Sequence, residues 1–81
     1  MVNLKKYNAV FTPDKAVGFI VTIPTLPGCV TYGKNLSEAK KMAKDAIRVY
    51  LKSLEKHGEP VPSDEESYFA SVDVPFPIAY A

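Results

Sequence analysis

One long amphipathic segment, residues 35–58, constrains the fold of this chain more than any other feature. Apolar side chains recur there at spacings of three and four, the period of an α-helix: Leu36, Ala39, Ala43, Ala46, Ile47, Tyr50, Leu51 and Leu54. The opposite side carries the basic residues Lys40, Lys41, Lys44, Arg48 and Lys52. The pattern predicts a helix roughly 30 Å long, whose single apolar stripe can cover only one face of a sheet.

Both ends of this predicted helix carry residues that favour helix termination. Asn35 can act as the N-cap, because its side chain can accept a hydrogen bond from a backbone amide of the first turn. Glu38 stands three positions later, as in a capping box. Gly58 can adopt the positive φ that ends many helices, and Pro60 cannot continue one. We therefore expect the helix to lie between Asn35 and Gly58.

Four other segments alternate apolar and polar residues with the period of a β-strand. Residues 5–12 and 18–23 flank a short turn and predict a β-hairpin, residues 29–32 predict a third strand, and residues 67–74 a fourth. The order is therefore β-β-β-α-β. It predicts an α+β two-layer sandwich, in which an antiparallel-dominated sheet carries one long helix on one face.

The connection between the second and third predicted strands is rich in conformationally special residues. Pro24 and Pro27 each fix φ, and Gly28 permits a positive φ, so the three predict a stiff structural turn. Leu26 lies in the middle of this turn. Two alternatives stay open for its side chain: it is folded beneath the loop, or it is presented on the loop as a contact for a partner.

The chain of 81 residues forms one domain, residues 1–81. Residues 75–81 make an apolar tail that contains Pro75 and Pro77, and we expect it to dock on its own domain or on a neighbouring subunit. The strands carry apolar residues on both faces, whereas the helix covers one. We therefore expect a homo-oligomer, a dimer or a tetramer, or a partner protein to bury the second face.

The overall charge and hydropathy point away from nucleic acid and membranes. Ten Lys and Arg against nine Asp and Glu leave a net charge of +1, which gives no general attraction for polyanions or anionic lipid. The N-terminus lacks the apolar region of a signal peptide, and no apolar run has the length of a membrane span. We expect a cytoplasmic protein that does not contact a membrane.

Groups able to do chemistry are isolated along the chain. His57 stands alone at the end of the helix, where a cation is favourable, and Cys29 has no cation beside it that would lower its pKa. The acidic residues lack the spacing of a metal site. We therefore expect no metal, no cofactor and no enzyme activity. The acidic run Asp64, Glu65 and Glu66 is either a solvated loop or an acidic binding surface.

Taken in order, these pieces resemble the HicB-like antitoxin family. The motifs are an aromatic first strand (Tyr7 to Phe11), the pair Gly18-Phe19, the turn from Pro24 to Cys29, the helix start from Asn35 to Ala39 and the segment from Gly58 to Pro62. The resemblance spans about Tyr7 to Val74. Thr25 stands where the family usually has an acidic residue, and Asn35 replaces the usual threonine cap.

This resemblance implies a partial RNase H-like fold and a role in a toxin–antitoxin system. The family typically binds a small basic HicA-type toxin, which cleaves mRNA, and blocks its active site. Asp64, Glu65 and Glu66 are then the first candidates for charge complementarity, with Leu26 and its loop as a second contact. Many members carry a C-terminal DNA-binding domain, which does not fit before Ala81, so we expect no direct DNA binding. The alternative is a stand-alone oligomeric scaffold or ligand-binding module without a toxin.

Overall fold

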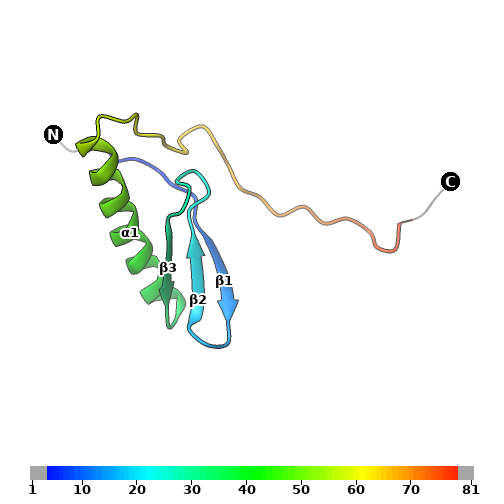
Figure 1. The fold of residues 1–81 in the computed structure, drawn as a ribbon. Coiled ribbons are helices and arrows are strands. Elements are labelled where there is room, and N and C mark those ends of the chain that lie inside the picture. The colour runs from blue at the N-terminus through cyan, green and yellow to red at the C-terminus, as the bar shows by residue number, and fades with distance from the viewer. Residues whose placement is uncertain (1–3, 79–81) are drawn as a thin grey trace.

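The computed structural model describes residues 4–78 of the chain. Three strands, β1 (Val10–Asp14), β2 (Gly18–Thr22) and β3 (Val30–Gly33), precede one helix, α1 (Leu36–Lys56). The strands form an antiparallel sheet in the order β1-β2-β3, so each strand pairs with the next one along the chain. The helix lies against one face of this sheet (Figure 1). The predicted α+β arrangement is confirmed.

The register of the sheet sorts the strand residues onto two faces. Phe11 pairs with Val21, and Val21 pairs with Thr31. This row faces α1, where Val21 and Thr31 are buried. Successive strand residues point to opposite faces, so Val30 and Tyr32 lie on the other side, where they are 47% and 54% exposed. Within residues 4–78, the second face of the sheet is therefore left without a covering layer.

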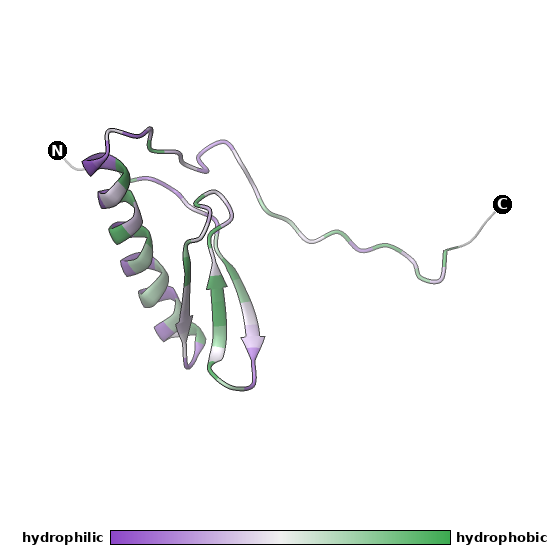
Figure 2. Cartoon of the chain, viewed as in Figure 1, coloured by the Kyte–Doolittle hydropathy of each residue, from purple (hydrophilic) through white to green (hydrophobic). Residues whose placement is uncertain are grey.

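Helix and sheet meet over a small core. Its buried apolar members are Val21, Ile23, Leu26, Cys29, Ala39 and Ala43. Figure 2 shows this apolar character along β2 and on one side of α1. A Cβ atom added to Gly33 would lie 2.4 Å from the Cα atom of Ala39. Only glycine at this position lets β3 and the first turn of α1 approach so closely.

Both predicted helix ends are confirmed. The Asn35 side chain accepts a hydrogen bond of 2.8 Å from the Glu38 amide. The Glu38 carboxylate accepts one of 3.0 Å from the Lys34 amide, one residue before the position a capping box uses. Gly58 has φ of 66°, and the Glu59 amide donates to the Leu54 carbonyl at 2.9 Å, as in a Schellman motif. Among the described residues, no helix combines the length and the apolar character needed to cross a membrane.

The loop between β2 and β3 is closed by its own backbone. The Ile23 amide donates to the Cys29 carbonyl at 3.1 Å, the Leu26 amide to the Ile23 carbonyl at 2.9 Å, and the Cys29 amide to the Leu26 carbonyl at 3.0 Å. Gly28 has φ of 81°, as a turn of this shape requires. Leu26 is 0% exposed and belongs to the core. Of the two alternatives, the side chain takes the one beneath the loop.

The fourth strand expected over residues 67–74 is not formed. Residues 68–78 run in an extended line away from the sheet, all of them exposed (Figure 1). A strand needs a neighbour with which to exchange backbone hydrogen bonds, and the described chain offers none to this segment. The element order is thus β-β-β-α, and the RNase H-like fold and the docking of the tail stay predictions. Residues 79–81 of the tail lie outside the described residues.

Truncation of Leu26 tests the core. We expect Leu26→Ala to lower the free energy of unfolding by about 2–5 kcal/mol, because it removes a fully buried side chain and leaves a cavity. Val49, which is 68% exposed on α1, provides the control, and Val49→Ala should change the same quantity by less than about 0.5 kcal/mol. Urea unfolding followed by circular dichroism measures both. Equal effects of the two substitutions would show that Leu26 is not a core residue.

Candidate functional site

The acidic run that follows α1 divides into one buried and two exposed carboxylates. Asp64 is 3% exposed, whereas Glu65 and Glu66 are exposed. The separation follows from the path of the backbone, which turns between Asp64 and Ser67 and closes with a hydrogen bond of 3.0 Å from the Ser67 amide to the Asp64 carbonyl. The turn therefore points one acid inward and places two at the surface.

Asp64 ties together three parts of the chain that are distant in sequence. Its Oδ1 atom accepts a hydrogen bond from the Thr25 hydroxyl, in the loop between β2 and β3. Its Oδ2 atom accepts one of 2.9 Å from the Asn8 amide, and its own amide donates to the Lys6 carbonyl at 2.8 Å. A buried carboxylate is tolerated only when such donors replace water. Asp64 is thus an anchor for the fold, and a contact of this residue with a partner stays a prediction.

The same contacts decide the charge of Asp64. The hydrogen bond from Thr25 lowers the pKa of the Asp64 carboxyl, and the Asn8 amide and the Lys6 ammonium act in the same direction. Burial alone would raise this pKa, but the three other interactions together outweigh it. Asp64 is therefore ionised at neutral pH. An acidic residue at position 25, where the family usually has one and this chain has Thr25, would place a second carboxylate beside that of Asp64.

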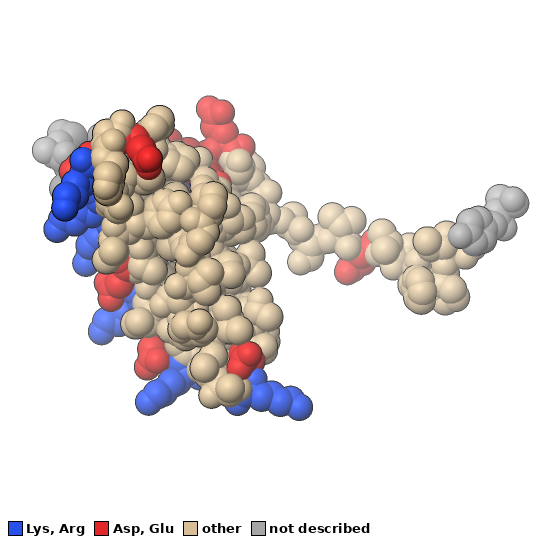
Figure 3. Space-filling model, in the orientation of Figure 1, with Lys and Arg blue, Asp and Glu red and all other residues tan. Residues whose placement is uncertain are grey.

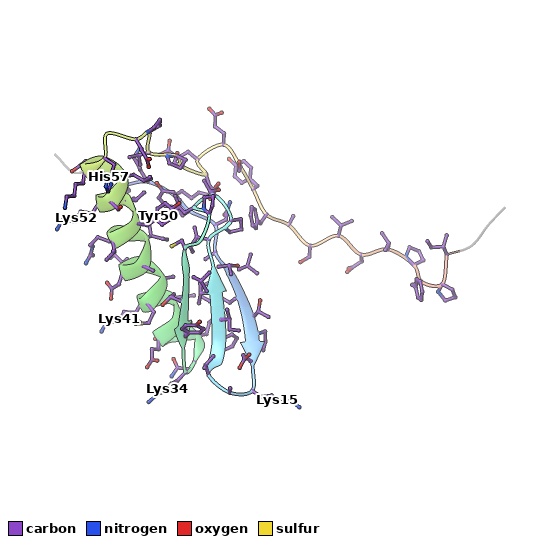
Figure 4. All side chains as sticks on the ribbon, viewed as in Figure 1. Lys15, Lys34, Lys41, Tyr50, Lys52 and His57 are labelled. Carbon is purple, nitrogen blue, oxygen red and sulfur yellow. The ribbon has the colours of Figure 1, made fainter. Side chains whose placement is uncertain are left out.

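Two tyrosines hold the neighbouring segments in place. The Tyr7 hydroxyl donates a hydrogen bond to the Pro62 carbonyl, just before the turn formed by residues 64–67. Burial raises the pKa of Tyr7, and the charges of Asp64 and Glu65 raise it further, so the phenol stays a donor. The Tyr50 hydroxyl reaches from α1 to the Pro27 carbonyl at 2.9 Å (Figure 4). The turn of residues 64–67 and the loop between β2 and β3 are thus both hydrogen-bonded, through neighbouring residues, to the rest of the domain.

The far end of the acidic turn is fastened as well. The Ser67 carbonyl accepts hydrogen bonds from the Lys6 ammonium at 3.1 Å and from the Asn8 side-chain amide at 3.3 Å. The Lys6 ammonium also lies 4.1 Å from the centre of the Tyr68 ring. Glu65 and Glu66 therefore stand at the tip of a turn that is held on both sides. This acidic turn, defined as residues 64–67, is the candidate site.

The charge distribution sets this turn apart from the helix. Along the outer side of α1, Lys and Arg side chains alternate with acidic ones, and acidic side chains stand at the end of the molecule where the segment after α1 runs (Figure 3). The helix pair Asp45 and Arg48, 3.7 Å apart, is exposed and contributes little to stability. The mixed charges favour a solvated helix face over a binding surface for nucleic acid.

The isolated reactive groups lie apart from each other. Cys29 is 6% exposed, and burial raises the pKa of its thiol, so it packs as a small apolar side chain. His57 stands at the end of α1, with its Nδ1 atom 2.8 Å from the Ser53 carbonyl (Figure 4). In the described part of the chain, no three His, Cys, Asp or Glu side chains gather as metal ligands would.

Sequence reasoning missed Asn8, Thr25 and Tyr7 as parts of this site. The partners of Asp64 lie 39 and 56 positions away in the chain, and no local pattern joins them. One signal was present: Thr25 replaces the expected acid, and a hydroxyl is the group that can donate to a carboxylate brought close by the fold.

The sequence of this chain is similar to those of known proteins. The model of a family described as HicB_like antitoxin of bacterial toxin-antitoxin system matches residues 7–73. A UPF0150 protein of Thermoplasma acidophilum is 46% identical over 59 residues, which cover 73% of this chain and 86% of that protein. A UPF0150 protein of Helicobacter pylori is 36% identical over 69 residues, which cover 85% of this chain and 94% of that protein.

The anchor can be tested through Thr25. Thr25→Val removes the hydroxyl, so we expect the pKa of Asp64 to rise toward its ordinary value, whereas Thr25→Ser keeps the donor and the lowered pKa. An NMR titration of the Asp64 carboxyl carbon measures both. Identical titrations of the two variants would contradict the hydrogen bond.

The lowered pKa of Asp64 also predicts the direction in which the stability of the fold changes with pH. The unfolded chain binds a proton at Asp64 more readily than the native chain does, so native stability rises with pH in this range. The contribution is present above the ordinary carboxyl pKa of about 4 and is lost as pH falls through the lowered native value. Urea unfolding at pH 7 and pH 3 should show a smaller loss on acidification for Thr25→Val than for Thr25→Ser. A loss of the same size in both variants would exclude this contribution.

Proposed function

Because the chain belongs to the HicB-like antitoxin family of bacterial toxin–antitoxin systems, we propose that it binds a small basic toxin of the HicA type, an mRNA-cleaving protein, and blocks it. Family membership supports an antitoxin role in general. The toxin class, the contact surface and the mode of inhibition are the proposal. The acidic turn is the observation that carries it.

Electrostatics favours the acidic turn as the contact. A protein that cleaves RNA presents Lys and Arg side chains to phosphate groups. Glu65 and Glu66 offer carboxylates to the same cations from an exposed position. Complementary charges accelerate the encounter and select the partner. The two glutamates would thus occupy the place of two phosphates.

The anchoring of the turn improves this contact. Association costs free energy when loops must be ordered at the interface. Here the Thr25 and Asn8 donors hold Asp64 on one side, and the Lys6 ammonium holds Ser67 on the other. The glutamates are therefore presented in place before the toxin arrives. Inhibition needs only that the RNA-binding surface be covered, which agrees with the non-enzymatic role that the family suggests.

Charge reversal at the turn tests the proposal. We expect Glu65→Lys and Glu66→Lys each to weaken binding of the toxin by about tenfold, because each replaces an attractive charge pair worth roughly 1.5 kcal/mol. The candidate toxin is the short basic protein encoded next to this chain, purified as a catalytically inactive variant. Isothermal titration calorimetry at low and moderate salt measures the affinity.

Asp45→Lys on α1 is the matched control, because Asp45 is an exposed acid outside the turn and its reversal changes the net charge by the same amount. It should leave the affinity within about twofold. Equal losses of affinity in all three variants would show that net charge, and not the acidic turn, determines binding. Absence of binding, together with no rescue of growth on co-expression, would exclude the antitoxin reading and favour the stand-alone scaffold.

A further inference from the structure

A groove of about 630 Å³ runs between α1 and the chain that leads into and begins β1. It exists because α1 packs mainly against β3 and β2. Tyr7, Ala9 and Phe11 line one wall, and Ala43, Ile47 and Leu51 line the other. All six are apolar or aromatic, and Tyr7, Ala9 and Phe11 are only partly buried. The groove therefore exposes part of the core.

The edge of the sheet beside this groove is also open. β1 pairs with β2 on one side, and no strand among residues 4–78 pairs with its other side. The backbone carbonyls along this edge, and the amides of its residues other than Pro13, can accept another strand. A strand placed there would add backbone hydrogen bonds and would bring every second side chain over the groove.

The extended segment 68–74 has the properties of that strand. Tyr68, Val72 and Val74 are 81%, 82% and 75% exposed, and they alternate with Phe69, Ser71 and Asp73. Seven residues of strand span about 23 Å, enough to follow the five residues of β1, which span about 17 Å. Among residues 4–78, the segment is thus an extended stretch without a partner strand, and β1 has an edge without one.

We propose that residues 68–74 of one copy of this chain pair with the free edge of β1 in a second copy, with Tyr68, Ala70, Val72 and Val74 over the groove. The contact is reciprocal, so each copy gives one segment and receives one, as in a twofold dimer. It does not depend on the proposed toxin.

The path of the chain favours a second copy as the source of the strand. The acidic turn already lies beside the start of the edge, through the hydrogen bond between the Asp64 amide and the Lys6 carbonyl. After Ser67 the chain leaves its own sheet instead of continuing along β1 (Figure 1). Among residues 4–78 no strand pairs with its own edge, while its apolar segment projects away from the domain.

A polyanion is the competing occupant, because Lys40, Lys44 and Arg48 also border the groove. The walls are nevertheless apolar, and phosphate groups gain nothing from contact with alanine, isoleucine and leucine side chains. Apolar side chains of a strand satisfy both the walls and the open backbone edge. The structure therefore favours the strand over RNA.

Two substitutions in the segment test the contact by solution mass, measured by light scattering. Val72→Asp would put a charge over the groove, and we expect the mass to fall by half or more relative to the unchanged chain. Ser71→Asp adds the same charge on the alternate side and should leave the mass unchanged. Both positions are exposed in the single chain, so circular dichroism should show the same fold in both variants. A monomeric unchanged chain, or equal masses for the two variants, would overturn the proposal.

A mixed-label experiment identifies the source of the strand. A spin label on Ser71→Cys, in a Cys29→Ala background, is placed on unlabelled chain and mixed with ¹⁵N-labelled chain that carries no spin label. We expect the amide signals of Val10, Phe11, Thr12 and Asp14 in β1 to broaden in the ¹⁵N-labelled copy. Broadening only when label and isotope share one chain would show that the segment folds back on its own sheet and would overturn the exchange. Broadening of these amide signals by added spin-labelled RNA, without any from the segment, would assign the groove to a polyanion instead.

Discussion

The packing of one helix on one face of a three-stranded sheet is the constraint on which the rest of this structure depends. The contact is close, because Gly33 has no side chain to separate β3 from Ala39. The apolar stripe of α1 packs mainly against β3 and β2, and a groove lies between it and the chain at β1. Within residues 4–78, two apolar surfaces consequently stay uncovered: the outer face of the sheet and the groove beside β1. A small domain can complete such surfaces by association.

Asp64 supplies the second organising contact. The helix ends near Gly58, and the chain that follows has no regular structure to hold it. A charged carboxylate, satisfied by a hydroxyl and a backbone amide, draws this segment against the N-terminus and the β2–β3 loop. The arrangement turns an acidic run into a shaped surface, since the inward acid fixes the positions of Glu65 and Glu66. The lowered pKa of Asp64 is the electrostatic consequence.

The two proposals meet at the acidic turn. The acidic turn itself is tied to its own domain, and the exposed segment that follows it is the strand proposed to pair with a second copy. Pairing of segment 68–74 with a second copy would hold the chain on the C-terminal side of the acidic turn as well. Glu65 and Glu66 would then be more rigidly placed. A dimer built in this way would also present two acidic turns, so that one assembly could engage two toxin molecules.

The amino-acid sequence determined the local features of this protein: the bounds of α1, its caps at Asn35 and Gly58, the hairpin and the stiff loop from Pro24 to Gly28. These features depend on residues a few positions apart, so periodicity and turn chemistry reveal them. Only the tertiary structure decided that Leu26 is buried, that Asp64 is an anchor, and that the segment 68–74 has no strand partner within the described part of the chain. Each of these outcomes depends on groups far away along the chain or on a surface left open, and local sequence carries no record of either.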